Sequence, residues 1–301
     1  MNKNQESVKG NRNHKDTVFR MLFREKKELL SLYNAMNGSA YTNPDELRIV
    51  TLENAVYMSM KNDLAFLADF HLYLYEHQST VNSNMPLRFL QYVAREYEKL
   101  TGEDSLYRRK RIALPAPRFV VFYNGKEYFP EKSKLLLSEA YEADRDDPQL
   151  ELKVQVLNIN EGNNEELKDQ CRVLKEYMQY VGCVREYAEE IPVEEAVSRA
   201  VDECIEHGIL AEFLRENRSE VIPVSIFEYN EEEALKAIKA DEYELGFQDG
   251  NKQGISRSIA LLIETCAELG NAREDTLSKI MEKFALDQSE ANRYMEEYWK
   301  Q

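Results

Sequence analysis

Three side chains with the chemistry of a metal site lie in one short stretch of the chain, KNDLAFLADFHLYLYEHQST. The stretch is typical of two closely joined strands, and we centre the turn between them on Asp69 and Phe70. Opposed residues of an antiparallel pair then have numbers that sum to 139, so Asp63 is predicted to face Glu76. Gln78, two residues after Glu76, shares that face of its strand.

Two facing carboxylates repel each other, so the pair needs a cation or a shared proton. A Mg²⁺ or Mn²⁺ ion held by Asp63, Glu76, water and a substrate phosphate is the natural partner. The prediction depends on the register, because a slip of one residue would turn the side chains of one strand to the other face. The alternative is that both acids are surface residues of a strand pair. His77 should point to the opposite face, where a structural role is expected.

Helices and further strands surround this hairpin. Apolar residues recur at helical spacing from Asp16 to Asn37, and Gly38 ends that helix. A second helix is expected from Pro86 to about Leu100. The expected strands are 49–58, 63–69, 72–78, 118–123 and 150–157, and the pattern is helical and acidic from residue 164 onward. This order predicts an α/β core with a helical C-terminal extension.

The domain prediction has three parts: a disordered N-terminus over residues 1–15, a core over 16–160 and an acidic helical region over 161–301. Charged residues are also distributed unequally between the N-terminal and C-terminal parts of the chain. The 301 residues carry a net charge of −16, yet residues 1–130 hold 19 basic and 15 acidic side chains, and residues 131–301 hold 20 and 40. The first part can therefore approach phosphates, whereas the second cannot. Charge alone also fits an ordinary acidic protein surface.

Several protein classes are not expected. No stretch approaches the ~18 to 20 uncharged apolar residues of a membrane helix. The first residues, MNKNQESVKGNRNHKD, are polar and lack the apolar run of a secretory signal. The four cysteines are dispersed and have no zinc-site spacing, which favours buried thiols in a reducing compartment. We therefore expect a cytoplasmic protein without a membrane partner.

The order helix, three strands, helix, strand, with an Asp followed by Glu-x-Gln on the next strand, resembles the core of the PD-(D/E)XK nucleases. The phrases TLENAVYMSMKNDLAF, LYLYEHQSTVNSNMPLRFLQYVAREYEKL, PAPRFVVFYNG and LNINEGNNEEL resemble the PD-(D/E)XK family transposases, which are related to the recombination-promoting nucleases. The resemblance covers most of residues 14–220. Its most specific part is EHQST followed by NMPLR.

The resemblance implies that Asp63 and Glu76 bind the metal ion. Gln78 occupies the place of the motif's lysine, which would orient the attacking water and offset charge. A glutamine can orient water by hydrogen bonding but brings no positive charge. Lys61, across the hairpin in the assumed register, would supply one.

Members of this superfamily often add an acid from the first helix, and here Asp16 or Glu28 could serve. The phrase KDxxFRxLF favours Asp16, although Asp16 could equally be the N-terminal cap of that helix. The implied mechanism is metal-assisted hydrolysis of a phosphodiester, in which the ion lowers the pKa of a bound water and stabilises charge on the phosphate.

Two groups of basic residues are candidates for phosphate contacts. On the helix after the hairpin, the residues with core spacing are Leu87, Leu90, Ala94 and Tyr97, and a second stripe holds Arg88, Tyr92, Arg95 and Lys99. The stripe could equally be an ordinary solvated face. The loop before strand 118–123 carries the densest basic run, Arg108, Arg109, Lys110 and Arg111.

These observations predict a Mg²⁺- or Mn²⁺-dependent DNA endonuclease, linked by the resemblance to recombination, mobile elements or defence. The alternative is a catalytically inactive nucleic-acid-binding or protein-interaction module on the same fold, which Gln78 and the net acidic charge favour. A third reading is a nuclease whose acidic helical tail masks its basic surface or drives assembly into a homo-oligomer.

Overall fold

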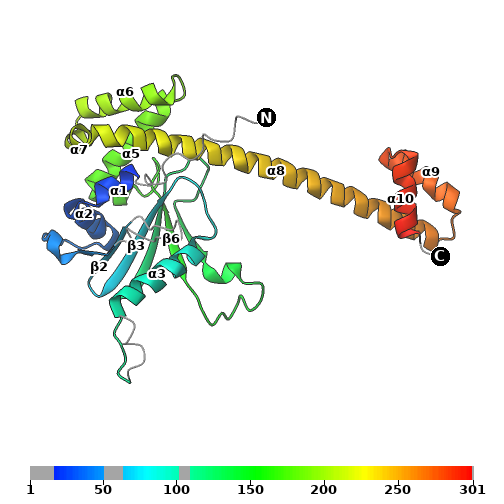
Figure 1. Cartoon of the computed structure of the whole chain (residues 1–301), viewed down its shortest axis with the longest axis horizontal. Helices are drawn as coiled ribbons and strands as arrows, with labels where there is room; N and C mark the ends of the chain where they lie inside the picture. The colour runs from blue at the N-terminus through cyan, green and yellow to red at the C-terminus, as the bar shows by residue number, and fades with distance from the viewer. Residues whose placement is uncertain (1–16, 51–63, 102–108, 300–301) are drawn as a thin grey trace, which may run out of the picture. The chain divides into compact units, whose positions relative to one another are not determined.

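The computed structural model describes residues 17–50, 64–101 and 109–299. Within them, one mixed sheet has the strand order β1-β2-β3-β4-β6-β5 (Figure 1). The strands are β1 Arg48–Ile49, β2 Leu64–Ala68, β3 His71–Gln78, β4 Ala116–Tyr123, β5 Lys132–Leu136 and β6 Lys153–Asn158. The pairs β3–β4 and β4–β6 are parallel, and the other neighbours are antiparallel. The chain is therefore α/β, as predicted.

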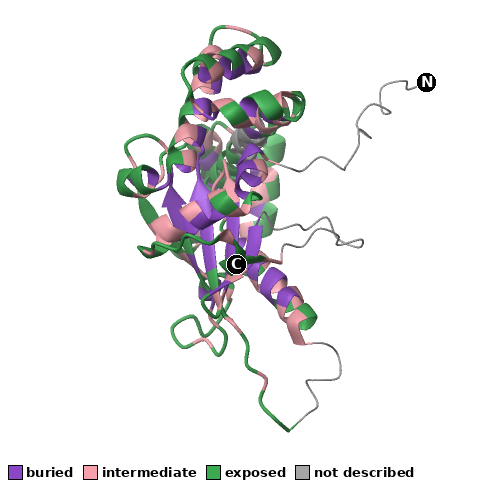
Figure 2. Ribbon diagram, turned by 90° about the vertical axis from the view of Figure 1, so that its left-hand side faces the viewer, coloured by how far each residue is buried: buried purple, intermediate pink, exposed green. Residues whose placement is uncertain are grey.

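Helices cover both faces of this sheet, which is why its strands are largely buried (Figure 2). Helix α3 (Met85–Thr101) joins the parallel strands β3 and β4 and packs on one face, where Phe89 and Phe119 lie with ring centroids 5.2 Å apart. The opposite face is covered by α1 (Val18–Phe23), α2 (Lys26–Asn37) and α5 (Arg172–Tyr187). Alternate residues of β3 thus face different helices.

The first predicted helix is two helices in the structure. The backbone leaves the helical conformation at Glu25, the N-cap of α2, and Gly38 ends α2 in the left-handed region as expected. Thr17 caps α1 by accepting a hydrogen bond from the backbone N–H of Arg20 at 3.1 Å. The N-terminal cap predicted at Asp16 is therefore one residue later, and Asp16 itself lies outside the described residues.

The buried face of α3 differs in part from the predicted one, because Leu90 and Tyr97 pack against the core but the other two predicted residues do not. Leu87 is 45% exposed and Ala94 is exposed, whereas the buried residues are Met85, Pro86, Phe89, Tyr92, Val93 and Glu96. The large side chains Phe89 and Tyr92 bury more apolar area than the leucine stripe would, and this turns the helix toward them. Tyr92, which the prediction placed on a solvated basic stripe, is fully buried.

Two strand predictions also need correction. β5 was not predicted, because KSKLL is short, rich in lysine and lacks a clear alternation of apolar and polar residues. It pairs with β6 at the edge of the sheet, a position that lysines suit. β6 begins at Lys153 rather than at residue 150. Of the strand predicted over 49–58, residues 51–58 lie outside the described residues.

The remaining helices are α4 (Glu165–Gln170), α6 (Val193–Glu206), α7 (Ala211–Glu216), α8 (Arg218–Glu268), α9 (Arg273–Phe284) and α10 (Gln288–Tyr298). The chain divides into two compact units, Met1–Glu232 and Glu233–Gln301. This division differs from the boundary expected near residue 160, because α5, α6 and α7 share a hydrophobic core with the sheet.

The second unit has a small apolar core of its own, formed by Ile259, Ile263, Ile280, Ala291 and Met295. In the described part of the chain, no helix combines the length and the apolar character that crossing a membrane requires.

Candidate active site on the β2–β3 hairpin

The hairpin has the register that the sequence analysis assumed. Leu64 pairs with Tyr75 and Ala68 with His71, so Asp69 and Phe70 form a two-residue turn. Both turn residues have positive φ angles, 46° and 61°, as a type I′ turn requires. Asp63 and Lys61 lie outside the described residues, whereas Glu76 and Gln78 belong to β3.

Glu76 is a buried carboxylate on the α3 face of the sheet. Its side chain is 4% exposed, and Oε2 lies 3.5 Å from Nη2 of Arg88 on α3. A buried ion needs such compensation, because removal from water is costly for a charged group. β3 and α3 therefore position an acid and a cation against each other.

Further contacts hold Arg88 in place. Its Nη2 donates to the hydroxyl of Tyr92 at 2.9 Å, and its Nη1 lies 3.3 Å from the sulfur of Met85. The amide nitrogen of Gln78 also donates to that sulfur, at 2.7 Å. We call these five residues (Glu76, Gln78, Met85, Arg88 and Tyr92) the β3–α3 cluster. It joins the predicted residues Glu76 and Gln78 to three neighbours from α3.

Two members of the β3–α3 cluster, Glu76 and Gln78, carry oxygen atoms of the kind that hard cations prefer. A carboxylate and an amide oxygen are typical ligands of Mg²⁺ and Mn²⁺. Among the described residues, no group of three or more His, Cys, Asp or Glu side chains could hold a metal ion. Glu76 would thus need a partner acid, and the predicted partners Asp63 and Asp16 both lie outside the described residues.

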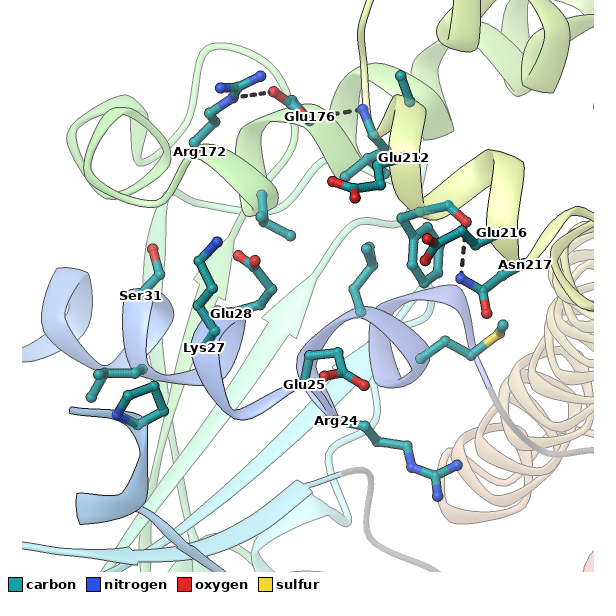
Figure 3. Close-up of a pocket in the computed structure, with 18 of the residues that line it drawn as sticks. Arg24, Glu25, Lys27, Glu28, Ser31, Arg172, Glu176, Glu212, Glu216 and Asn217 are labelled. Atoms are coloured by element: carbon teal, nitrogen blue, oxygen red, sulfur yellow. Dashed lines mark hydrogen bonds and ion pairs between the residues drawn. The ribbon is translucent and has the colours of Figure 1, made fainter. Parts of the chain in front are cut away.

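Glu28, the alternative acid from the first helical region, is not brought to Glu76. It belongs to α2, on the opposite side of the sheet from α3, and lines an open groove of about 1400 Å³ (Figure 3). The groove lies between α1 and α2 on one side and α5 and α7 on the other. Its acidic side chains (Glu25, Glu28, Glu176, Glu212, Glu216 and Glu220) outnumber its basic ones (Arg24, Lys27, Arg172 and Arg215). This charge balance does not favour binding of a nucleic acid.

His77 points to the face opposite Glu76, as predicted. Its ring stacks on Phe19 with centroids 4.9 Å apart, and Nε2 lies 3.1 Å from the hydroxyl of Tyr177. Burial, together with the nearby charge of Arg185, lowers the pKa of His77 to about 3. His77 is therefore a neutral core residue at physiological pH.

The predicted phosphate contacts have different environments. Arg88 faces Glu76, and Lys99 forms an ion pair with the buried carboxylate of Glu96 at 3.3 Å. Arg95 is half-buried, and its Nη1 has no hydrogen-bond partner within the described part of the chain. Arg109, Lys110 and Arg111 are exposed in the loop before β4, and Arg108 lies outside the described residues.

Comparison with known proteins adds no family assignment. No protein-family model matches the chain, and searches among curated proteins and solved structures found no similar protein.

Sequence reasoning missed Arg88 and Tyr92 as neighbours of Glu76. The only signal for Arg88 was its position three residues after Met85, which places both on one side of the helix. This spacing would have pointed to Glu76 only if the face of α3 that packs on the sheet had been predicted correctly. The spacing of the leucines indicated a different face.

Proposed function

We propose that the chain is a metal-dependent DNA endonuclease whose active site is formed by the β3–α3 cluster together with Asp63. The observation that carries the proposal is the carboxylate of Glu76, buried at the carboxyl end of a central strand, with Gln78 two residues further on. A buried acid is costly unless something compensates its charge, and sites with this property are often functional.

The arrangement of the strands supports a PD-(D/E)XK-like core. An antiparallel hairpin, β2–β3, is followed by α3, and α3 leads to β4, which runs parallel to β3. This is the order of elements on which the sequence resemblance was based. The hairpin register runs from Ala68↔His71 to Leu64↔Tyr75. This is the register from which Asp63 was predicted to face Glu76. We include the resemblance to PD-(D/E)XK family transposases in the proposal on these grounds.

The residues fit a hard divalent cation. Glu76 offers a carboxylate and Gln78 an amide oxygen, and Asp63 and Asp16 are the acids that we propose as further ligands. When bound, Mg²⁺ or Mn²⁺ would supply Lewis-acid activation of a water molecule and stabilise charge on the phosphate.

The described side chains have separate tasks in this proposal. Arg88 holds the carboxylate of Glu76 in a defined orientation, and Tyr92 in turn holds the guanidinium of Arg88. Gln78 orients the attacking water through a hydrogen bond, since its neutral amide cannot supply charge. Arg88, one third exposed and 3.5 Å from Glu76, is also close enough to meet a phosphate bound next to that carboxylate.

Cleavage of supercoiled plasmid tests the proposal. The purified protein should nick the plasmid with Mg²⁺ or Mn²⁺ but not with EDTA, and Glu76→Gln or Asp63→Asn should abolish nicking. Glu96→Gln is the matched control, because Glu96 is also a buried acid paired with a cation, but its partner Lys99 lies toward the far end of α3. Nicking that survives both active-site changes, or a Glu96→Gln variant that is equally inactive, would refute the assignment.

One observation favours the inactive module as a second candidate. The carboxylate of Glu76 already has Arg88 as its counter-ion, and a salt bridge can replace a metal ion in a site that has lost catalysis. That candidate predicts DNA binding in EDTA equal to that in Mg²⁺, with no nicking in either. Calorimetric titration with Mn²⁺ separates the two, because only the nuclease should bind the ion through Glu76.

The cellular setting also belongs to the proposal. The four cysteines, Cys171, Cys183, Cys204 and Cys266, are free thiols, in keeping with a reducing compartment such as the cytoplasm. A role in recombination, mobile elements or defence follows from the resemblance. Assembly into a homo-oligomer through the acidic helical region is the last part of the proposal.

A further inference from the structure

The tip of the β2–β3 hairpin carries an unusual residue. Phe70 is 95% exposed and has a φ of 61°, in the left-handed region. The second position of a type I′ turn is normally glycine, because a bulky side chain is strained there. An exposed phenylalanine at this position gains no packing energy that would offset the strain. Such strain persists where the surrounding structure imposes it, and it is common at functional sites.

The turn is held on both sides. Oδ2 of Asp69 accepts hydrogen bonds from the hydroxyls of Tyr33 at 2.7 Å and Tyr41 at 2.8 Å. These two bonds also keep the pKa of Asp69 below its usual range, so the acid stays ionised and bound. On the other side, the backbone N–H of Ala116 donates to the carbonyl of Phe70 at 3.0 Å. Phe70 is therefore presented on a rigid support, with its ring in solvent.

Exposed cations surround this support. Arg118 on β4 is exposed, and its Nη2 lies 3.4 Å from the ring of His71, the residue after Phe70. Arg48 on β1 is exposed and pairs with Leu67, three residues before Phe70. The basic run Arg109–Arg111 lies in the loop before β4, and its last residue is five positions before Ala116, which contacts the turn.

We propose that Phe70 is a DNA contact that stacks on nucleobases, either as a wedge at a duplex step or on an unpaired base. An exposed aromatic ring on a rigid support, next to cations that can bind phosphates, is the combination that such contacts use. The cations favour DNA as the occupant, because arginine and lysine side chains next to the ring can contact the phosphates on either side of a stacked base.

This inference rests on the proposed function for the choice of DNA as ligand, but it concerns a different part of the molecule. Phe70 lies in the turn, directly before the first residue of β3 and six residues before Glu76. At about 3.3 Å per residue the two are roughly 20 Å apart along β3. Phe70 therefore contributes to binding rather than to hydrolysis, and the two roles can be tested separately.

The test measures binding of short DNAs in EDTA, where no cleavage occurs. A duplex and the matching single strand each carry one 2-aminopurine, whose fluorescence reports stacking. Phe70→Ala should weaken binding by at least about fivefold and remove the fluorescence change, in line with stacking on one base. Phe70→Trp should restore both. Tyr128→Ala is the matched control, because Tyr128 is also a 95% exposed aromatic residue outside this patch, and it should bind like wild type.

The variant Phe70→Gly distinguishes loss of the ring from misfolding, since glycine suits the conformation of the turn. It should lose affinity as Phe70→Ala does, without a lower melting temperature. Loss restricted to the duplex identifies a wedge, loss restricted to the single strand identifies stacking on an unpaired base, and loss on both DNAs means that Phe70 stacks in both ways. A Phe70→Ala variant with wild-type affinity and an unchanged fluorescence response overturns the inference, as does a wild-type chain that binds neither DNA. The plasmid-nicking assay with Glu76→Gln is a separate experiment. If it contradicts the nuclease proposal, the binding that depends on Phe70 can still be observed.

Discussion

The stability of the first unit should depend on His77 in acid. The folded protein holds this residue neutral with a pKa of about 3, whereas a histidine in the unfolded chain has a pKa of 6.5. Below pH 6.5 the unfolded chain therefore binds a proton that the folded protein rejects, and stability falls as the pH falls toward 3. Between about pH 7.5 and pH 5 the loss amounts to about 2 kcal/mol. Because His77 keeps some solvent contact, this figure is an upper value.

The replacement His77→Phe isolates this contribution. It keeps a ring stacked on Phe19 but removes the contact with the hydroxyl of Tyr177, which should cost about 1 kcal/mol at neutral pH. On acidification the variant should lose less stability than wild type, so the difference between the two shrinks or reverses near pH 5. Other acids titrate in both proteins and cancel in the comparison.

Urea unfolding followed by far-UV circular dichroism is the suitable assay. The single tryptophan, Trp299, belongs to the second unit, so its fluorescence would not report on the sheet. If His77→Phe and wild type lose stability in parallel between pH 7.5 and pH 5, the reasoning from burial of His77 is refuted.

Three further predictions concern other parts of the chain. Arg88→Met should lower stability by about 2 kcal/mol, because the buried carboxylate of Glu76 loses its counter-ion; thermal unfolding should show the loss, and Mn²⁺ should restore part of it. Gly125→Ala should destabilise by about 3 kcal/mol in urea unfolding, since a Cβ there would lie 2.0 Å from the carbonyl oxygen of Ser79. Deletion after Glu232 removes 14 acidic and 9 basic residues, so DNA affinity should rise, most clearly at low salt; unchanged affinity would contradict masking by the tail.

The hairpin could be predicted from the sequence because two independent signals agreed. The alternation of LYLYE sets one face of β3, and the short gap between two apolar runs leaves room only for a two-residue turn. Together these signals determine the register, and with it the face that Glu76 and Gln78 share. The class of the fold followed from the order of strands and helices, a coarse property that tolerates errors of several residues at each boundary.

The environment of Glu76 could not be predicted in the same way. α3 has two apolar stripes of similar strength, one with Leu87 and Leu90 and one with Phe89 and Tyr92, and sequence spacing does not rank them. Which stripe is buried depends on the shape of the sheet surface that receives it. Here the aromatic stripe packs on the sheet, and this rotation brings Arg88 to Glu76. A helical rotation of one position thus gives Arg88 a counter-ion role at Glu76 that the predicted phosphate contact did not include.

β3 links the two proposed DNA contacts physically. The strand pairs with β2 on one side and β4 on the other, so the separation of Phe70 from Glu76 is set by backbone hydrogen bonds rather than by a loop. A separation of roughly 20 Å corresponds to about six base pairs of duplex at about 3.4 Å each. If one duplex meets both residues, 2-aminopurine moved along the DNA should respond most strongly about six base pairs from the cut. A response without a fixed distance to the cut would mean that Phe70 and Glu76 act on different DNA segments.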